Sequence, residues 1–121
     1  MTILEAIAKI DMLLPNGYRQ EEKIAWLSTL DGMIMAEIMR GYEGAPVSFA
    51  GYDTNTPTDT KLFAPPPYDA IYLYLLEAKI HYYDAEYTKY NNAMAMYNRA
   101  WESFAADYSR HHLRRRGRFL F

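Results

Sequence analysis

The residues best suited to chemistry in this sequence are a histidine and two carboxylates. Glu77 and His81 are four residues apart and Asp84 follows three residues later, so on a helix the three side chains share one face. A metal site can begin with such a pattern, but it needs further ligands, and no second pair follows in the sequence. Two interpretations remain open: a surface Glu–His–Asp patch, which we favour, and a small metal protein or enzyme built on Glu77 and His81.

Motifs for other catalytic chemistries are missing from the sequence. There is no cysteine, which excludes disulfides, thiol catalysis and cysteine zinc sites. There is also no Gly-x-Ser-x-Gly, no Ser-x-x-Lys and no phosphate-binding Gly-Lys-Ser/Thr. We therefore predict that the protein is not an enzyme and that it carries no cofactor and no metal.

The C-terminal end combines arginines with aromatic residues. The last twelve residues carry a charge of +5, whereas residues 1–109 hold eight basic and fifteen acidic residues, a balance of −7. Such a tail can dock on an acidic protein surface, contact nucleic acid or simply be solvated. The final Phe-Leu-Phe favours docking, because a solvating tail does not need it. The candidate docking residues are Arg114, Arg115, Arg116, Arg118, Phe119 and Phe121.

The remaining residues predict an all-α fold in a single domain, residues 1–113, followed by the basic tail, residues 114–121. Thr2 and Glu5 have the spacing of a capping box at the start of a first helix, which ends at Pro15. A second helix is expected over residues 20–40, with Gly41 as its stop. No stretch approaches the ~20 apolar residues of a membrane span, and we see no signal peptide, so we expect a soluble protein without a membrane partner.

A long connection follows the short N-terminal helical pair. Residues 42–66 are rich in glycine and proline, which exclude a helix. Val47 and Phe49 alternate with small residues, which predicts a short strand or one arm of a β-hairpin. A loop of this length is more often functional than a plain connection, although a floppy surface insertion is the alternative. The candidate contact residues in the loop are Val47, Phe49 and Tyr52.

The last part of the chain carries one long apolar stripe. Its members recur every three or four residues over about five heptads, which is typical of a coiled-coil seam. They are Leu73, Leu76, Ile80, Tyr83, Tyr87, Tyr90, Met94, Tyr97, Trp101, Phe104 and Tyr108. We expect one continuous or kinked helix over residues 67–111; two antiparallel helices joined at Asn91-Asn92 are the alternative.

A continuous helix of this kind would be on the order of 65 Å long, whereas a globule of this chain length has a radius of gyration of about 14 Å. The helix would overhang its own domain and need neighbouring copies to bury the stripe. The candidate self-association residues are Tyr83, Tyr87, Tyr90, Tyr97, Trp101, Phe104 and Tyr108.

Several segments together resemble a known family. They are Leu14-Pro15-Asn16, Lys23-Ile24-x-Trp26-Leu27, Leu30-Asp31, Gly51-Tyr52-Asp53, Pro67-Tyr68-Asp69-x-x-Tyr72, Glu86-x-x-x-Tyr90-Asn91-Asn92-x-Met94 and Tyr108-x-Arg110-x-His112. In this order and spacing the sequence is similar to small helical proteins of tailed phages and prophages from Gram-positive bacteria. These are encoded in the head and head–tail joining region, and some are called head–tail connector or adaptor proteins.

The resemblance implies a virion structural protein that joins the portal to the tail. Such connectors typically form a twelve-fold ring beneath the portal, with DNA passing through the channel without sequence-specific binding. The implied partners are further copies of the chain, the portal and tail-joining proteins. The implied location is the head–tail interface of the virion, and the bacterial cytoplasm during assembly. The alternative is a nucleic-acid-binding or regulatory module that uses the arginine-rich tail.

Overall fold

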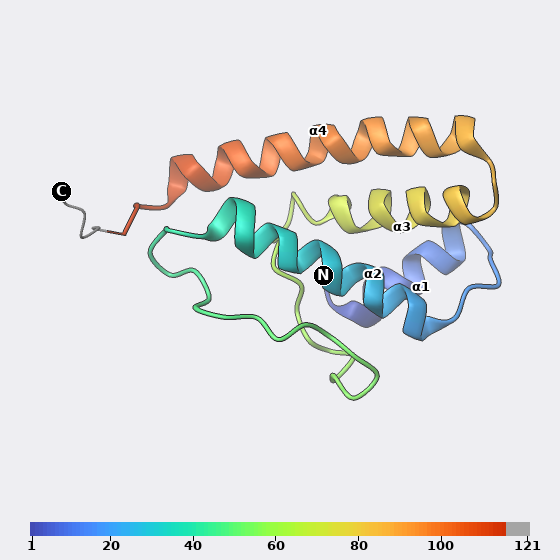
Figure 1. Cartoon of the computed structure of the whole chain (residues 1–121), viewed down its shortest axis with the longest axis horizontal. Helices are drawn as coiled ribbons and strands as arrows, with labels where there is room; N and C mark the ends of the chain where they lie inside the picture. Colours follow the sequence, from blue (N-terminus) through green and yellow to red (C-terminus); the bar gives the residue numbers. More distant parts are fainter. Residues whose placement is uncertain (116–121) are drawn as a thin grey trace.

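The computed structural model describes residues 1–115. The regular secondary structure of these residues is helical, and they contain no strand. In chain order the helices are α1 (Ile3–Leu13), α2 (Gln20–Ile34), α3 (Ala70–Tyr83) and α4 (Tyr87–His111), and α2 continues into one π-helical turn, η1 (Met35–Met39). Figure 1 shows α4 along one side of the bundle, α3 in the middle, and α1 and α2 on the other side. The all-α prediction is therefore confirmed.

The N-terminal helical pair forms as the sequence predicts. The Thr2 side chain accepts a hydrogen bond from the Glu5 backbone N–H at 3.1 Å, and the Thr2 N–H donates to the Glu5 carboxylate at 2.8 Å. This capping box satisfies two backbone donors that would otherwise have no partner at the start of α1. The second helical segment, α2 with η1, covers almost the whole predicted range and ends just before Gly41, whose φ of 86° only glycine adopts readily.

The expected continuous helix over residues 67–111 is wrong, because the chain reverses at residues 84–86. The alternative of two antiparallel helices describes the arrangement (Figure 1), but the joint lies before Asn91-Asn92, so its expected position is wrong. At the end of α3 the Glu86 N–H donates to the His81 carbonyl at 2.9 Å and the Ala85 N–H donates to the Tyr82 carbonyl at 3.1 Å. With Ala85 in the left-handed region at φ 60°, this is a Schellman cap. It turns α3 and α4 into an antiparallel hairpin.

The hairpin explains why the stripe keeps its spacing through a turn. Each helix of a packed antiparallel pair needs an apolar face with the same three-four spacing, so the pattern identifies the buried faces but not the chain direction. α3 makes contacts with α1, α2 and α4, and its buried residues accordingly occupy several sides of the helix. The core is formed mainly by the side chains of Ile3, Leu27, Leu30, Ile34, Ile71, Leu76, Ile80 and Phe104.

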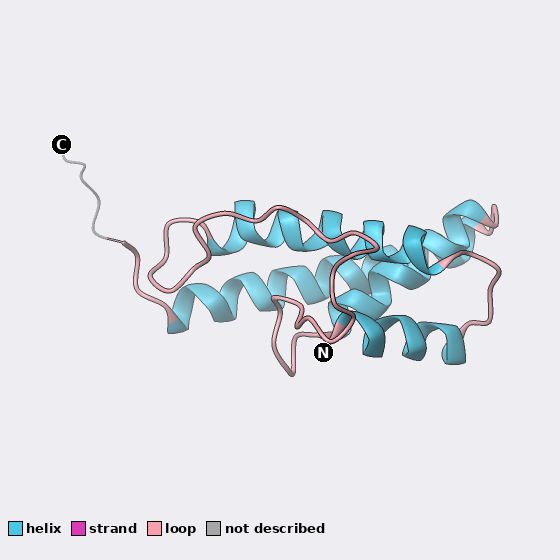
Figure 2. Ribbon diagram, turned by 90° about the horizontal axis from the view of Figure 1, so that it is seen from below, coloured by secondary structure: helices cyan, strands magenta, loops and turns pink. Residues whose placement is uncertain are grey.

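The segment between η1 and α3 runs along the outside of the helices (Figure 2). It contains no strand, so the expected strand or hairpin arm at Val47 and Phe49 is wrong. The physical reason is that its polar groups and rings bind elsewhere: the Tyr52 N–H donates to the Ser28 hydroxyl at 2.9 Å, and the Phe49 ring packs edge-on against Tyr52 at 4.9 Å. Side chains of α2 hold the segment around Tyr52. Backbone hydrogen bonds hold its later part to the start of the chain, where the Ile3 N–H donates to the Thr60 carbonyl at 3.1 Å and the Leu62 N–H donates to the Met1 carbonyl at 3.0 Å.

Candidate assembly surfaces at the two ends of the bundle

An exposed aromatic cluster surrounds the turn between α3 and α4. The ring of Tyr82 lies 5.3 Å from Tyr83, 6.0 Å from Tyr87 and 5.3 Å from Tyr90. Tyr83 is 55% exposed and Tyr87 is 57% exposed. We call these four residues the turn-end cluster. Tyrosines that are half in solvent offer a large apolar face and a polar tip, which suits a contact between proteins.

A groove opens beside the turn-end cluster. It has a volume of about 520 Å³ and its walls come from α2, α3 and α4, including Met33, Leu75, Tyr82, Tyr83, Tyr90 and Met94. We call this hollow the turn-end groove. Its walls are mainly aromatic and methionine side chains, with Leu75, Ala78 and one lysine, Lys79. Methionine adapts its shape to an incoming aromatic ring and makes favourable sulfur–ring contacts. The groove is therefore chemically suited to apolar side chains.

Three of the seven candidate self-association residues are used inside the chain. Tyr97, Phe104 and Tyr108 are buried in the hairpin and its contact with the rest of the bundle. Burial raises the pKa of the Tyr97 hydroxyl to about 12. These three side chains present almost no surface to another copy. The expectation that the whole stripe waits for neighbouring copies is corrected, because α3 and α4 cover each other.

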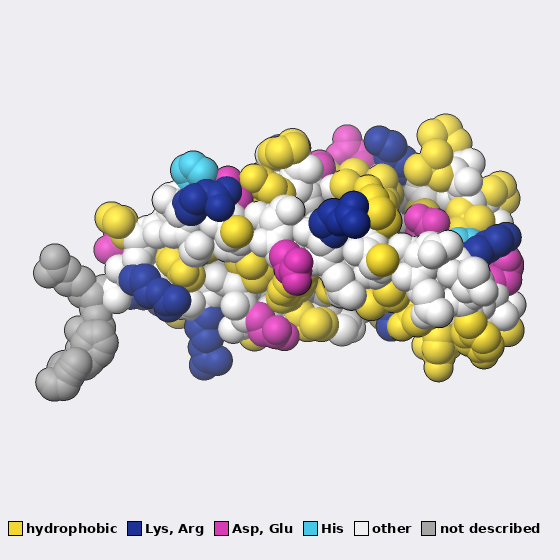
Figure 3. All heavy atoms as spheres, turned by 90° about the horizontal axis from the view of Figure 1, so that it is seen from above, with side chains coloured by type: hydrophobic (Ala, Val, Ile, Leu, Met, Phe, Trp, Pro, Cys, Tyr) yellow, Lys and Arg dark blue, Asp and Glu magenta, His cyan; other side chains and the backbone are white. Residues whose placement is uncertain are grey.

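The other four candidates, Tyr83, Tyr87, Tyr90 and Trp101, keep accessible surface. Tyr83, Tyr87 and Tyr90 belong to the turn-end cluster, so the accessible part of the stripe is concentrated near the turn. Figure 3 shows hydrophobic side chains gathered at that end of the molecule.

The opposite end of the bundle carries the first residues of the basic tail. The Arg115 N–H donates to the Gly41 carbonyl at 2.7 Å, and the Arg115 guanidinium donates to the Ala45 carbonyl at 3.1 Å. The Arg114 guanidinium lies 4.6 Å above the centre of the Tyr42 ring, a cation–π contact. Both arginines thus bind the chain's own loop. The other candidate docking residues, Arg116, Arg118, Phe119 and Phe121, lie outside the described residues.

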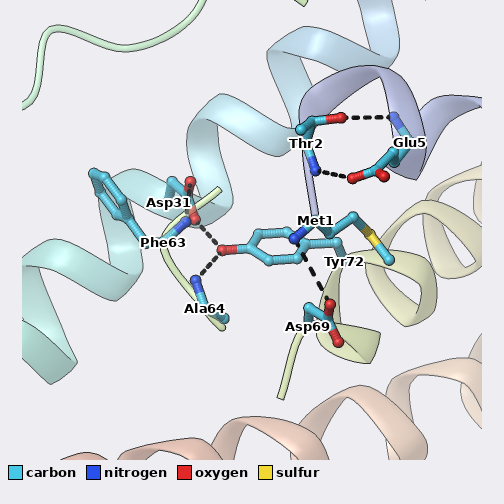
Figure 4. A network of polar contacts seen from close by, with 8 residues as sticks. All are labelled: Met1, Thr2, Glu5, Asp31, Phe63, Ala64, Asp69 and Tyr72. Carbon is cyan, nitrogen blue, oxygen red and sulfur yellow. Dashed lines mark hydrogen bonds and ion pairs between the residues drawn. The ribbon is translucent and has the colours of Figure 1, made fainter. Parts of the chain in front are cut away.

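A buried carboxylate fastens the long loop to the bundle (Figure 4). Asp31 of α2 is fully buried, and its two oxygens accept hydrogen bonds from the hydroxyls of Tyr52 and Tyr72, each at 2.5 Å, and from the Phe63 N–H at 3.1 Å. The Tyr72 hydroxyl also accepts from the Ala64 N–H at 2.7 Å. The network therefore joins α2, the loop and α3 at one point.

The electrostatics of this network follow from burial. Burial raises the pKa of Asp31, and hydrogen bonds from the two tyrosines and the Phe63 N–H partly offset the rise. Burial also raises the pKa of Tyr52 and of Tyr72, and the neighbouring Asp31 raises both further. All three groups are satisfied by one another, which is the arrangement of a structural network.

The three candidate loop residues have different environments. Tyr52 is bound to Asp31, and Phe49 packs against Tyr52 and against Phe63 at 5.0 Å. Val47 is 89% exposed. Val47 is thus the candidate loop residue whose side chain is free for a contact outside the chain.

The Glu–His–Asp pattern does not form a cluster of ligands. His81 is buried, with its Nε2 atom 3.6 Å from the Glu77 carboxylate and its Nδ1 atom without a hydrogen-bond partner among the described residues. Asp84 instead accepts a hydrogen bond from the Tyr18 hydroxyl at 2.7 Å. Within residues 1–115 there is no group of three histidine or acidic side chains placed to hold a metal ion.

Two residues at the turn end come from distant parts of the sequence. Trp26 of α2 stacks on Tyr83 at 5.8 Å with the rings 7° from parallel, and Tyr18 lies edge-on to Trp26 at 5.9 Å. The hydrogen bond to Asp84 raises the pKa of Tyr18 to about 12. Sequence reasoning did not place either residue here. Their aromatic type was a signal, but their position depends on how α2 crosses α3.

Comparisons of this chain with protein-family models, curated proteins and solved structures find no match. Among the described residues, no helix is long and apolar enough to cross a membrane.

Proposed function

We propose that this chain is a non-enzymatic structural protein of a phage or prophage virion, an adaptor that assembles with copies of itself between the portal and the tail. The observation that supports this most is that the exposed tyrosines and the arginines lie at opposite ends of the bundle. A turn-end cluster of half-exposed tyrosines lies at one end of an elongated bundle, and the arginine-rich end lies at the other (Figure 1).

Two ends with different chemistry suit a protein that must contact two kinds of neighbour. Exposed apolar patches are uncommon on monomeric proteins unless they bind something. Arginine is enriched at protein interfaces because its flat guanidinium pairs with carboxylates and stacks on rings. The resemblance to head–tail connector proteins supplies the identity of the neighbours, the portal and the tail-joining proteins.

The test is assembly with the portal. The purified chain is mixed with an assembled portal ring, and binding is followed by sedimentation and negative-stain electron microscopy. We expect the chain to self-associate as its concentration rises and to add a ring of density to the portal. A chain that stays monomeric at every concentration and leaves the portal unchanged contradicts the proposal.

The same experiment separates the alternative of a nucleic-acid-binding module. DNA binding through arginines weakens steeply with salt, because each phosphate contact releases a counterion. The adaptor proposal predicts portal binding that persists without DNA. Salt-sensitive DNA binding with no portal binding would favour the alternative.

A further inference from the structure

We propose that the turn-end groove receives the C-terminal Phe-Leu-Phe, residues 119–121, of a neighbouring copy, so that subunits join head to tail. This inference rests on the proposed function and names the contact by which copies associate.

The groove has the shape and chemistry that a short apolar peptide needs. Its volume of about 520 Å³ lies between the walls of α2, α3 and α4, which is within the range of pockets that hold small ligands. Tyr82, Tyr83 and Tyr90 can meet a phenylalanine ring edge-on, and Met33 and Met94 add sulfur–ring contacts. Two phenylalanines separated by one leucine match this lining.

The tail cannot reach the turn end of its own chain. His111 is twenty-one residues beyond Tyr90 in the same helix, a distance of about 32 Å at 1.5 Å per residue. Figure 1 shows the described chain leaving α4 in the direction away from the turn. The six residues after Arg115 span at most about 20 Å when fully extended. A Phe-Leu-Phe segment that fills the turn-end part of the groove therefore belongs to another copy.

Charge favours this meeting of opposite ends. Residues 1–109 carry a balance of −7 and the last twelve residues carry +5. Asp84 directly follows Tyr83, a residue of the groove wall, and is the acidic side chain where Arg116 and Arg118 of an incoming tail would arrive. Lys79, on the groove wall, has the same charge as the incoming arginines and works against their approach.

The chain already uses one contact of the required type. The Arg114 guanidinium packs on the face of Tyr42 at 4.6 Å, which shows that an arginine of this segment is stabilised by a tyrosine ring. The turn-end cluster offers the same ring faces to Arg116 and Arg118 of a neighbour. Because the groove and the tail are different parts of the chain, their contact is heterologous, and repeated contacts of this kind close into a ring when the rotation allows.

Cysteine crosslinking tests the contact directly, because the sequence contains no cysteine. Leu120→Cys and Met94→Cys are made as two single variants of the full chain, mixed, and oxidised in the presence and absence of a portal ring. We expect disulfide-linked dimers. The control pair is Leu120→Cys with Leu4→Cys, at a side chain that is 50% exposed and is not part of the groove lining. The 120–94 pair should crosslink at least about 10-fold more than this control, as a docked tail has a high local concentration.

The double variant that carries both cysteines in one chain distinguishes the source of the tail. Docking in a neighbour gives a ladder of linked chains. Crosslinked monomers instead would overturn the proposal, because they would place the tail in its own groove. A 120–94 yield no higher than the control in samples that are oligomeric would overturn it as well.

Side-chain truncation provides a second measurement. The double change Phe119→Ala with Phe121→Ala, and separately Tyr90→Ala, should each weaken self-association by about 10-fold or more, because aromatic anchors dominate interface energies. Leu4→Ala, at a side chain that is 50% exposed and outside the groove lining, should leave it unchanged. If rings form normally on the portal with these variants, the docking proposal fails and the adaptor function stands. If the unaltered chain neither self-associates nor binds the portal, both fail.

Discussion

Removing one hydroxyl from the buried network should destabilise the whole fold. In Tyr72→Phe, Asp31 loses a donor at 2.5 Å and the Ala64 N–H loses its acceptor at 2.7 Å, while the ring itself stays in place. A hydrogen bond to a charged group contributes about 1.5–3 kcal/mol, and a buried N–H without a partner costs about 1–3 kcal/mol. Ala64 is fully buried, so water cannot replace the lost acceptor. The expected loss in unfolding free energy is about 3–5 kcal/mol.

Urea unfolding followed by circular dichroism measures this loss, and thermal unfolding should show a midpoint lower by roughly 10–20 °C. The matched control is Tyr83→Phe, which removes a hydroxyl from a ring that is 55% exposed. The control should stay within about 0.5 kcal/mol of the unaltered chain. A loss below about 1 kcal/mol in Tyr72→Phe, with an unchanged denaturant slope, would refute the view that Asp31 fastens the loop to the bundle.

Three further predictions concern the turn, the loop and pH. Ala85→Gly should stabilise the chain by up to about 1 kcal/mol, because the φ of 60° at Ala85 is energetically costly for an L-residue. In a continuous helix the same change would instead cost about 1 kcal/mol. The sign of the change in unfolding free energy, measured by urea unfolding, therefore distinguishes the turn from a continuous helix. Gly51→Ala should lower the thermal midpoint, since Gly51 has a φ of 89° and a Cβ there would lie 2.9 Å from the Ser28 hydroxyl; Gly17→Ala, which meets nothing within 4 Å, is the control and should change little. Stability should also fall at alkaline pH, because burial raises the pKa of Tyr97 to about 12, above the value of about 10 expected in the unfolded chain. The stabilising contribution of the protonated Tyr97 hydroxyl is therefore fully present below pH 10 and is lost as the pH rises through 12. Unfolding titrations between about pH 8 and 12 should show this decline, and an unchanged unfolding free energy over the range would count against it.

Local sequence signals predicted the helical elements that they control. The capping box of Thr2 and Glu5 fixes the start of α1, and Gly41 follows the end of η1, as expected from residues a few positions apart. The apolar spacing from Leu73 onward correctly marks most of the faces that are buried, because burial repeats with the helical period. These features depend on neighbours within one or two helical turns.

The continuous helix was preferred to an antiparallel pair, and the position of the reversal between α3 and α4 was not predicted, because the usual signal of such a turn is missing. A Schellman cap normally has glycine in the left-handed position, whereas this chain places Ala85 there. The stripe also continues in phase from Tyr83 to Tyr87 across the turn, which imitates one long helix. Neither spacing nor propensity could reveal that α3 and α4 pack against each other.

The candidate site was predicted only in part for a similar reason. The tyrosines near the turn were visible in the sequence as an abundant residue type, but Tyr18 and Trp26 reach them through the crossing of α2 and α3. Asp31 binds partners twenty-one and forty-one residues away, and no local pattern encodes such distances. Tertiary packing, and not composition, decides which aromatics are buried and which stay exposed.

Sedimentation velocity of the full chain over a wide concentration range tests the account's central claim, assembly through the turn end. The variant for comparison is Tyr87→Asp, which places a charge on the turn-end cluster at the start of α4, where an acidic residue favours the helix. The account predicts that the unaltered chain forms larger species as its concentration rises, and that Tyr87→Asp remains a folded monomer. An unaltered chain that stays monomeric throughout, or a variant that assembles equally well, would contradict it.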